Sequence, residues 1–574
     1  MDSTTQHLQA TLDNEKGEGP LKPIETQDVA TSQLYHEDNV LTRYGLNLTS
    51  FKKGHYGKGT LELKRPMEAR HLNMIAIGGA IGAGFFVGSG KALSSGGPAS
   101  LIICFAMTGV LIFNVVFALG ELAVMFPISG GFYTYSTRFI DPSWGFAMGW
   151  NYIFSWAIIL PLELTVCGLV IRYWDTSVSI GVWITVFMGI LIILNLFGGI
   201  GYAEEEFWTS ILKIITISTF LVIAVVLVCG GGPSSGRYGE YQGGRLWQDP
   251  GAFRHGFRGF CSVFVTAAFS FNGSELVGLA AAESKNPTKA LPSAIKQVFW
   301  RVTLFYILGL GLIGLLIPSN DPRLVSESAY TDVSASPFVL VGLYADLRGY
   351  DHYINTVILI SVLSVGMSCV FGGSRTLTAL AQQGYAPEIF SYIDRSGRPL
   401  ASMIFMLAFG PLAYVNLSAS GPVVFDWLLA LGGLAATFSW GSICLAHIRF
   451  RKAWAYHGHT LEEIPFQAFG GVYGSWLGLF LCFIVLAAQF FTAIAPPGKD
   501  GLNDAAGFFK AYLALPFVLV FWAGGFIWKK SGWLTIANMD VDTGRREHDW
   551  DEINAYRQKV AAQPFWRRLI SKLF

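Results

Sequence analysis

The sequence predicts an all-α protein that crosses a membrane many times. Of its 574 residues, 52% are hydrophobic and only 14% are charged, whereas soluble domains carry about 25% charged residues. The mean hydropathy is +0.45. Apolar segments recur along the chain, each near the roughly 20 residues that a helix needs to cross a bilayer. We therefore expect a polytopic helical membrane protein.

Twelve such segments follow one another. Residues 1–70 precede them and are rich in Asp, Glu, Gln, Thr and Lys, so we expect a mostly disordered cytoplasmic tail. The predicted spans are 72–97, 99–126, 145–172, 180–199, 207–229, 259–283, 298–318, 355–381, 401–417, 424–447, 473–495 and 508–528, of which the ninth is short. Residues 71–450 hold the first ten spans, residues 451–530 the last two, and residues 531–574 form a second tail.

The positive charges of the short loops predict the orientation. Lys and Arg gather before span 1 and after spans 6, 8, 10 and 12, which all lie on one side of a twelve-span protein. Because short cytoplasmic loops carry an excess of Lys and Arg, both termini are expected in the cytoplasm. The loop 230–258 carries arginines on the other side, but long loops cross largely regardless of charge.

Span 1 is interrupted where a membrane helix should be regular. Its glycines occupy positions 78, 79, 82, 84, 88 and 90. Inside lipid, freed backbone groups are tolerated only where they line a cavity or meet a ligand. The break Ile81-Gly82-Ala83-Gly84 would present free N–H groups at a half-helix N-terminus, whose charge of roughly +0.5 suits a carboxylate. The alternative is close helix packing through small residues, although one packing face needs fewer glycines.

Span 6 contains a second polar interruption, within Phe269-Ser-Phe-Asn-Gly-Ser-Glu-Leu-Val-Gly278. Spans 1 and 6 each begin a set of five, and paired broken segments point to an inverted-repeat transporter with spans 11 and 12 outside the repeat. Carbonyls freed around Phe269 to Asn272 would accept from an ammonium group. Donors at one break and acceptors at the other fit a zwitterion. Phe269 or Phe271 would close over it as an aromatic lid, unless it packs in the core or against lipid.

Four ionisable residues are noted inside the predicted spans: Glu121, Glu163, Lys213 and Glu275. Each should face the protein interior or a wet cavity. Glu275, one turn from the span 6 break, is the first candidate for proton coupling, and its alternative role is a hydrogen bond that holds the break open. Lys213 either supplies a fixed ammonium where sodium-driven transporters hold Na⁺ or extends toward Glu204–Glu206 at the cytoplasmic face. Glu121 and Glu163 are expected to form structural polar bridges.

Other features exclude function classes or predict partners. There is no HExxH, GxSxG or CxxC pattern, so neither an enzyme, a metal site nor a cofactor is expected, and the net charge of +1 does not indicate nucleic-acid binding. The C-terminal residues 553–574 resemble an amphipathic helix that lies on the inner leaflet, and the alternative is a disordered basic tail. Lys16 and Lys22 in the N-terminal tail could accept ubiquitin, as any exposed lysine could.

Several longer motifs carry a family resemblance. They are Arg70-His-Leu-Asn-Met-Ile-Ala-Ile-Gly-Gly-Ala-Ile-Gly82, Gly120-Glu-Leu-Ala-Val-Met-Phe-Pro127, Phe264-Val-Thr-Ala-Ala-Phe-Ser-Phe271, Glu283-Ser-Lys-Asn-Pro-Thr-Lys-Ala-Leu-Pro292, Ser364-Val-Gly-Met-Ser-Cys-Val-Phe-Gly-Gly-Ser-Arg375, Trp440-Gly-Ser-Ile-Cys-Leu-Ala-His-Ile-Arg-Phe-Arg451 and Asp542-Thr-Gly-Arg-Arg546. With them the chain resembles fungal amino acid permeases of the yeast amino acid transporter family, within the amino acid–polyamine–organocation superfamily. It is most similar to the general permeases.

The resemblance implies twelve spans, a five-plus-five inverted repeat (LeuT-like) and proton-coupled uptake at the fungal plasma membrane. It implies that Ile81 to Gly84 take the carboxylate, that the backbone at Phe269 and Asn272 takes the amine, and that Phe269 gates the site. Glu275 and Lys213 would match polar positions tied to coupling, and Thr437 and Ser439 would line the side-chain pocket. One departure is Ala83, because relatives usually carry Ser or Thr between the two glycines.

The sequence thus predicts a proton-coupled amino acid symporter of broad specificity that works by alternating access. A narrower permease, for proline or acidic amino acids, would share every feature above. A nutrient receptor on the same fold is a further alternative, although such receptors often carry a longer N-terminal extension than the roughly 70 polar residues here.

Overall fold

The computed structural model describes residues 46–53, 67–127, 130–174, 176–325, 336–418, 421–498, 501–546 and 548–568, apart from the side chains of 421–431, 433 and 510. The chain forms two units, residues 1–51 and 52–574. In the first, residues 46–51 make a turn in which the Ser50 N–H donates to the Asn47 carbonyl (2.8 Å). The disorder predicted for the N-terminal tail falls largely outside the described residues, as do Lys16 and Lys22.

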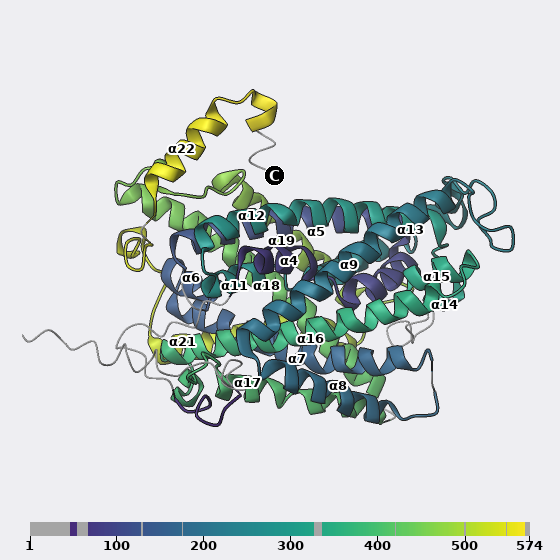
Figure 1. Cartoon of the computed structure of the whole chain (residues 1–574), viewed down its shortest axis with the longest axis horizontal. Coiled ribbons are helices and arrows are strands. Elements are labelled where there is room, and N and C mark those ends of the chain that lie inside the picture. Colours follow the sequence, from purple (N-terminus) through teal and green to yellow (C-terminus); the bar gives the residue numbers. More distant parts are fainter. Residues whose placement is uncertain are drawn as a thin grey trace, which may run out of the picture. The chain divides into compact units, whose positions relative to one another are not determined.

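Residues 52–574 are built from helices (Figure 1). Across the described ranges no β-strand occurs, and only the isolated bridges Lys53–Asp394 and Met67–Ser284 pair extended backbone. The elements are α4 (Ala69–Gly78), η1 (Gly84–Gly88), α5 (Ser89–Met125), α6 (Phe132–Phe139), α7 (Pro142–Ile171), α8 (Ile180–Asn195), α9 (Gly198–Val228), η2 (Trp247–Gly251), α10 (Gly256–Phe271), α11 (Leu276–Ala280), η3 (Ala281–Glu283), α12 (Pro287–Trp300), η4 (Arg301–Leu308), α13 (Gly309–Leu316), α14 (Pro322–Val325), α15 (Pro337–Tyr344), α16 (Tyr350–Gln382), η6 (Glu388–Ser391), α17 (Leu400–Leu407), η7 (Gly410–Leu417), α18 (Gly421–Tyr456), η8 (Leu461–Glu463), α19 (Gly471–Ile494), α20 (Ala505–Tyr512), α21 (Ala514–Lys529), η9 (Ile536–Asn538) and α22 (Trp550–Ala561).

Eight helical segments of the described chain are long and apolar enough to cross a membrane. They are Gly84–Met125, Pro142–Ile171, Gly198–Val228, Gly256–Glu283, Pro287–Leu316, Tyr350–Gln382, Leu400–Leu417 and Gly471–Ile494. The shorter helices α8 and α21 are also apolar. The predicted class of helical membrane protein is therefore confirmed, whereas these eight segments do not by themselves give the predicted count of twelve spans.

The first of these segments joins predicted spans 1 and 2 without a loop. Gly97 has a φ of +83° and is followed by Pro98, so the helix turns a corner there. The corner is bound by the chain before α10, since the Arg254 N–H donates to the Gly96 carbonyl (2.9 Å) and the Ala99 N–H to the Ala252 carbonyl (3.0 Å). A Cβ at position 97 would lie 2.7 Å from the Ala252 oxygen, so this corner requires glycine.

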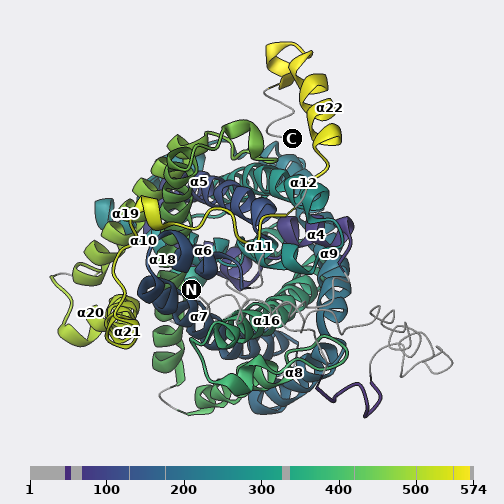
Figure 2. The same cartoon turned by 90° about the vertical axis from the view of Figure 1, so that its left-hand side faces the viewer.

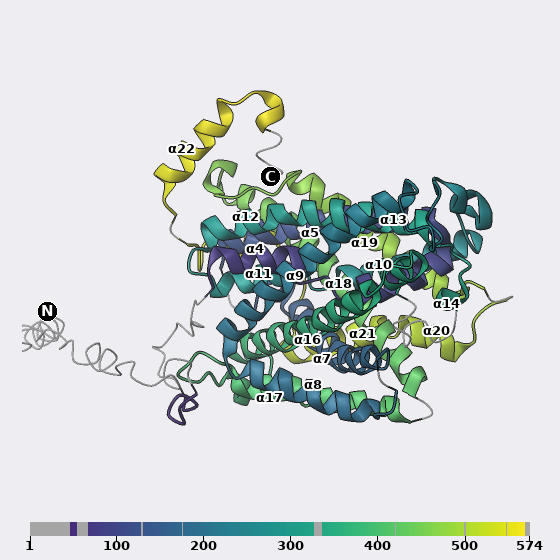
Figure 3. The same cartoon turned by 45° about the vertical axis from the view of Figure 1, so that its right-hand side comes forward.

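The long helices surround the short, interrupted ones. α5 packs along α10, α7 packs along α16, and α18 contacts both α7 and α19. α4 lies between α12 and α9, as Figures 2 and 3 show from two sides. The interrupted segments are thus enclosed by other helices, where freed backbone groups can be satisfied.

A buried ionic cluster joins three parts of the chain near the end of α5. Oε2 of Glu121 accepts from Arg451 Nη2 (2.8 Å) and from the Ala468 N–H (2.7 Å), and Oε1 lies 2.5 Å from Arg451 Nε in an ion pair and 3.0 Å from His447 Nε2. His447 Nδ1 lies 2.8 Å from the Ser475 hydroxyl. Glu121 therefore bridges α5, α18 and the segment before α19, as a structural polar bridge would.

The C-terminal segment is bound to the loops at the same end of the helices. The Leu534 N–H donates to the Ile140 carbonyl (3.0 Å), and the Arg546 N–H donates to the Met125 carbonyl (3.3 Å). The Thr460 N–H donates to Glu463 (2.8 Å), which holds the pKa of that carboxyl below its usual range, and Arg545 lies 3.7 Å from the same carboxylate. Of the predicted amphipathic helix 553–574, α22 covers residues up to Ala561, the helix is interrupted before Pro564, residues 565–568 are helical again, and 569–574 lie outside the described residues.

Replacing Glu121 by Gln should destabilise the protein. Breaking a buried ion pair leaves the partner charge uncompensated and costs about 3–5 kcal/mol. We expect a lower midpoint of thermal unfolding of the detergent-solubilised chain. The matched control is Glu552→Gln, which removes an exposed pair with Lys289 (2.8 Å) and should leave the midpoint unchanged. Equal midpoints for both variants would contradict a stabilising role of the cluster.

Candidate functional site

The first break lies between α4 and η1, as the glycine pattern predicts. α4 ends at Gly78, and helical structure resumes around Ala83. The Ile81 N–H donates to the Gly78 carbonyl (2.9 Å), and the Phe85 and Phe86 N–H groups donate to the Gly82 carbonyl (3.1 Å each). The N–H groups of Gly82, Ala83 and Gly84 have no acceptor among the described residues. They form the positive end of the helix that continues into α5.

The second break is a tight turn between α10 and α11. Asn272 to Glu275 leave the helix, and Gly273 has a φ of +90°, which favours glycine. The carbonyls that the sequence predicts to be free are already bonded: that of Phe269 accepts once, from the Asn272 N–H (3.2 Å), and that of Phe271 accepts twice, from the N–H (3.2 Å) and the hydroxyl (2.6 Å) of Ser274. A carbonyl has two lone pairs, so the Phe269 carbonyl can accept again. The Asn272 side-chain Nδ2 is buried and has no partner in the described chain.

The two breaks touch each other through their backbones. The Ser270 hydroxyl donates to the Gly84 carbonyl (2.7 Å). A Cβ on Gly84 would lie 2.8 Å from Ser270 Cα and 2.9 Å from Phe269 Cδ1. Gly84 therefore serves close packing as well as the break, so both interpretations of the glycines apply at this position.

The two candidate lid residues occupy different places. Phe269 is half-buried and lies against Gly84. Phe271 is fully buried and stacks on Tyr306 with ring centroids 4.2 Å apart. Of the two, only Phe269 lies at the contact between the breaks.

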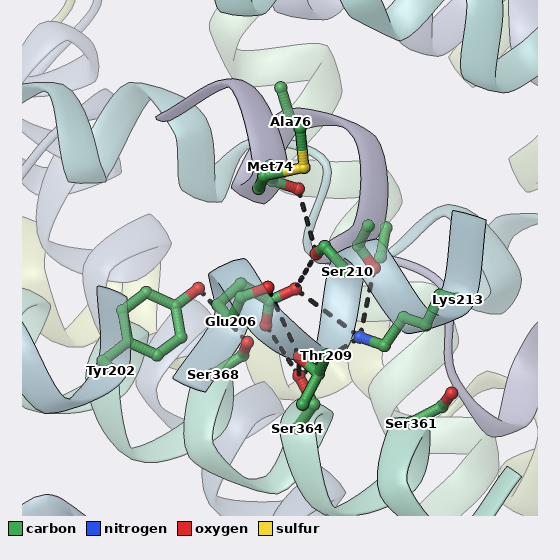
Figure 4. A network of polar contacts seen from close by, with 12 residues as sticks. Met74, Ala76, Tyr202, Glu206, Thr209, Ser210, Lys213, Ser361, Ser364 and Ser368 are labelled. Atoms are coloured by element: carbon green, nitrogen blue, oxygen red, sulfur yellow. Dashed lines mark hydrogen bonds and ion pairs between the residues drawn. The ribbon is translucent and has the colours of Figure 1, made fainter. Parts of the chain in front are cut away.

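Lys213 points inward to the end of α4 (Figure 4). Its Nζ donates to the Gly78 carbonyl (3.3 Å) and to the Ser364 hydroxyl (3.1 Å), and lies 3.5 Å from Glu206 Oε1. Glu206 also accepts from Ser210 and Ser364 (2.7 Å each). The sequence predicts a role for Lys213 and Glu206, but for Glu206 only as a group that an extended Lys213 would reach at the cytoplasmic face. It predicts no role for Ser210 or Ser364. The structure instead buries Lys213 and Glu206 completely.

Glu275 links the second break to α18. Its Oε2 accepts from Trp440 Nε1 (3.1 Å), while Oε1 has no hydrogen-bond partner in the described part of the chain. The side chain is 2% exposed. Both proposed roles of Glu275, proton carrier and hydrogen-bonded support, are compatible with this geometry.

The remaining predicted residues are buried but scattered. Thr437 Oγ1 in α18 has no partner among the described residues, and Ser439 donates to the Ala435 carbonyl of its own helix (3.4 Å). Glu163 in α7 was expected to form a polar bridge, yet its Oε2 has no hydrogen-bond partner within the described ranges. Glu121 belongs to the separate cluster near the end of α5.

Arg301 was missed from the sequence. It lies three residues inside predicted span 7, and its position within an apolar run was the available signal. The guanidinium is fully buried and donates to the Ala76 carbonyl (2.8 Å) and to the Ser274 hydroxyl (2.6 Å). It therefore connects the two interrupted segments.

An ion pair and a histidine–carboxylate contact join these segments to the long helices on the side of the breaks nearer Met67. Glu283 after α11 pairs with Arg375 of α16 (2.7 Å), and both side chains are nearly inaccessible. His71 of α4 lies 3.1 Å from Glu204 of α9. Within the described residues there is no group of three His, Cys, Asp or Glu side chains that could hold a metal ion.

Comparison with known proteins points to one family. The family model described as "Amino acid permease" matches residues 71–538. "Amino-acid permease inda1" of Hypocrea atroviridis is 65% identical over 98% of each chain. "General amino-acid permease GAP1" of Saccharomyces cerevisiae is 50% identical over 88% of this chain and 85% of its own. "Cationic amino acid transporter 1" of Schizosaccharomyces pombe is 47% identical over 86% and 83%.

Gly84→Ala should impair amino acid uptake at the contact between the breaks. The added Cβ would meet backbone that cannot yield without separating the segments. Overpacking of this kind costs about 1–3 kcal/mol of stability, and the part of that cost that separates the breaks in the bound state raises KM, at most about 150-fold. The control is Gly189→Ala in α8, where no atom lies within 4 Å of the new Cβ. A KM unchanged in both variants would contradict close contact at Gly84.

Ala83→Ser should lower the KM for amino acids. The serine supplies the hydroxyl that the family resemblance leads us to expect between the two glycines, beside three N–H groups that have no acceptor among the described residues. One neutral hydrogen bond contributes about 1 kcal/mol, or an about fivefold lower KM. The KM is measured from the uptake of labelled amino acids at graded concentrations. Unchanged affinity and selectivity would mean that binding rests on the backbone alone.

Proposed function

The chain belongs to the amino acid permease family, and on that premise we propose that it imports amino acids together with protons across the plasma membrane. The family resemblance that the motifs predicted is confirmed, and its relatives are transporters rather than enzymes. The observation that carries the finer proposal is the contact between two interrupted segments, one of which offers N–H groups that have no acceptor in the described part of the chain.

The two breaks together suit a zwitterion. The N–H groups from Gly82 to Gly84 would bind the carboxylate, with Ile81 at the start of the same turn. The second lone pair of the Phe269 carbonyl and the backbone carbonyl of Asn272 would bind the ammonium group. Phe269 would close over the ligand, and Thr437 and Ser439 of α18 would face its side chain.

The proposed architecture has twelve spans and a five-plus-five inverted repeat. Its support is the corner at Gly97, which divides Gly84–Met125 into two spans, together with the apolar helices α8 and α21 and the long helix α18. The interrupted segments then begin each set of five. Both termini would be cytoplasmic, which agrees with the Lys and Arg content of the loops on that side.

Alternating access would then move the interrupted segments against spans 3–5 and 8–10. On the proposed cytoplasmic side, the pair Glu283–Arg375 joins the second interrupted segment to span 8. The contact His71–Glu204 joins the first interrupted segment to span 5. Release of a bound amino acid into the cell would require both pairs to open.

Proton coupling is proposed for Glu275. Its carboxyl is buried beside the second break, keeps one oxygen unbonded in the described chain, and can therefore gain or lose a proton with local rearrangement. The Lys213 ammonium supports a sodium-independent cycle, because it occupies the end of α4, where half-helix carbonyls in other transporters coordinate a cation. Glu163 is the second candidate, since its Oε2 lacks a partner among the described residues.

Broad specificity is favoured because general permeases are among the relatives. A relative named as a cationic amino acid transporter is almost as similar, so a narrower range is the alternative. Ubiquitin ligase machinery acting on Lys16 or Lys22 of the N-terminal tail would regulate surface abundance. A receptor that binds amino acids without carrying them is a further alternative on the same fold.

Uptake of a panel of labelled amino acids at two pH values tests these proposals. A yeast host without its own permeases expresses the full chain, and surface abundance is measured in the same cells. Uptake that rises at acidic pH for many amino acids supports a broad proton symporter. Binding without uptake would favour the receptor, and uptake of cationic amino acids alone would favour a narrow permease.

Glu275→Gln should abolish uptake or make it independent of pH while the protein still reaches the surface. Glutamine keeps the size of the side chain and can still accept from Trp440, but it cannot exchange a proton. The matched variant Trp440→Phe removes the hydrogen bond and keeps the carboxyl, so pH-dependent uptake should persist. Wild-type, pH-dependent uptake by Glu275→Gln would rule out its proton role.

A further inference from the structure

Span 7 contains a π-helical stretch, η4, beside the two breaks. α12, η4 and α13 form one continuous helix from Pro287 to Leu316, in which Arg301–Leu308 adopt the wider π geometry. π-Helical turns are rare and occur frequently at functional sites. Two side chains of η4, Arg301 and Tyr306, reach both interrupted segments.

Arg301 joins the end of α4 to the turn of the second break. Its two hydrogen bonds go to the Ala76 carbonyl of α4 and to the Ser274 hydroxyl. The carbonyl end of a helix carries a charge of roughly −0.5, so a guanidinium is a favourable partner for it. Burying a guanidinium costs several kcal/mol, and Nε has no acceptor in the described chain. An apolar side chain would be buried there at a lower cost in free energy, so packing alone does not explain why the residue is an arginine.

Tyr306 makes the equivalent connection one turn further along. Its hydroxyl donates to the Ser270 carbonyl at the end of α10 (2.8 Å) and lies 3.4 Å from the Ala80 carbonyl in the first break. Its ring packs independently of the hydroxyl, stacked on Phe271 at 4.2 Å and edge-on to Phe85 at 4.8 Å. The hydroxyl can therefore be removed without removing the packing.

The spacing of these two residues explains why the helix is widened here. Residues five apart point to different sides of an α-helix, which has 3.6 residues per turn. A π-helix bonds residue i to i+5, so residues five apart lie nearly above one another. The π geometry thus lets Arg301 and Tyr306 face the two breaks from one side.

We propose that η4 braces the substrate site, with Arg301 and Tyr306 as positioning residues that hold the two breaks in register. Each residue contacts one backbone carbonyl of the first segment and one polar group of the second. The N–H groups of the first break then face the carbonyls of the second at a fixed separation. This role rests on the proposed function, because the register it fixes is that of the amino acid site.

The test is the KM for amino acid uptake by Tyr306→Phe and Arg301→Lys in the full chain. Phenylalanine keeps both ring contacts and loses only the hydroxyl. Lysine keeps the charge but lacks the fork that reaches Ala76 and Ser274 together. We expect each variant to raise KM about tenfold, with a smaller change in the maximal rate per surface molecule.

Two further variants separate positioning from folding. Tyr135→Phe removes an equally buried hydroxyl, which donates to the Phe126 carbonyl (2.6 Å) far along the chain from the breaks, and should leave KM unchanged. Ser274→Ala and Arg301→Lys combined should raise KM by less than the product of their separate effects, because both remove the Arg301–Ser274 contact. Lower surface abundance with wild-type KM in Tyr306→Phe and Arg301→Lys would overturn the brace. If the unmutated protein itself carries no amino acid, the proposed function is rejected instead.

Discussion

Lipid offers no hydrogen-bond partners, so the polar groups that the two breaks release depend on partners within the protein or on a ligand. The carbonyls at the end of α4 receive donors from two sides, Lys213 of α9 and Arg301 of η4. Ser270 satisfies Gly84, and Tyr306 satisfies Ser270. After these contacts, the N–H groups of Gly82 to Gly84 remain without an acceptor in the described chain. In the described chain the first break thus keeps N–H donors without an acceptor beside bonded carbonyls of α4, which is the electrostatic character that the proposed carboxylate site requires.

The charged residues of the core divide into two kinds by their partners. Glu121 is surrounded by Arg451, His447 and a backbone N–H, so its charge is neutralised within one rigid cluster. Lys213 and Arg301 instead bind carbonyls of a ten-residue half-helix that ends in open chain. Charges of the first kind stabilise a single arrangement. Lys213 and Arg301 hold the short helix α4 through a few hydrogen bonds. These hydrogen bonds can be replaced by others when α4 moves.

The sequence predicts the helical class, the position of both breaks and the burial of Glu275 because glycine and charge are rare signals in apolar segments. It predicts the inward direction of Lys213 only as one of two options, since an extended lysine has the same local sequence. Arg301 was missed because the boundary of span 7 was placed beside it, while the continuous helix begins at Pro287. The π geometry of η4 produces no periodic pattern in the sequence, because this geometry depends on the contacts that η4 makes with α4 and α10. The unbonded Oε2 of Glu163 likewise depends on which side chains other helices bring near it.

The corner at Gly97 has a mechanical consequence. Its neighbours Gly96 and Ala99 are hydrogen-bonded to Arg254 and Ala252, only a few residues before α10 begins at Gly256. The far halves of both interrupted segments are thus joined at this end through hydrogen bonds between backbone groups. Displacing one half pulls the other with it. Opening at that end would then be a single event with a single rate, instead of two successive steps with an intermediate between them.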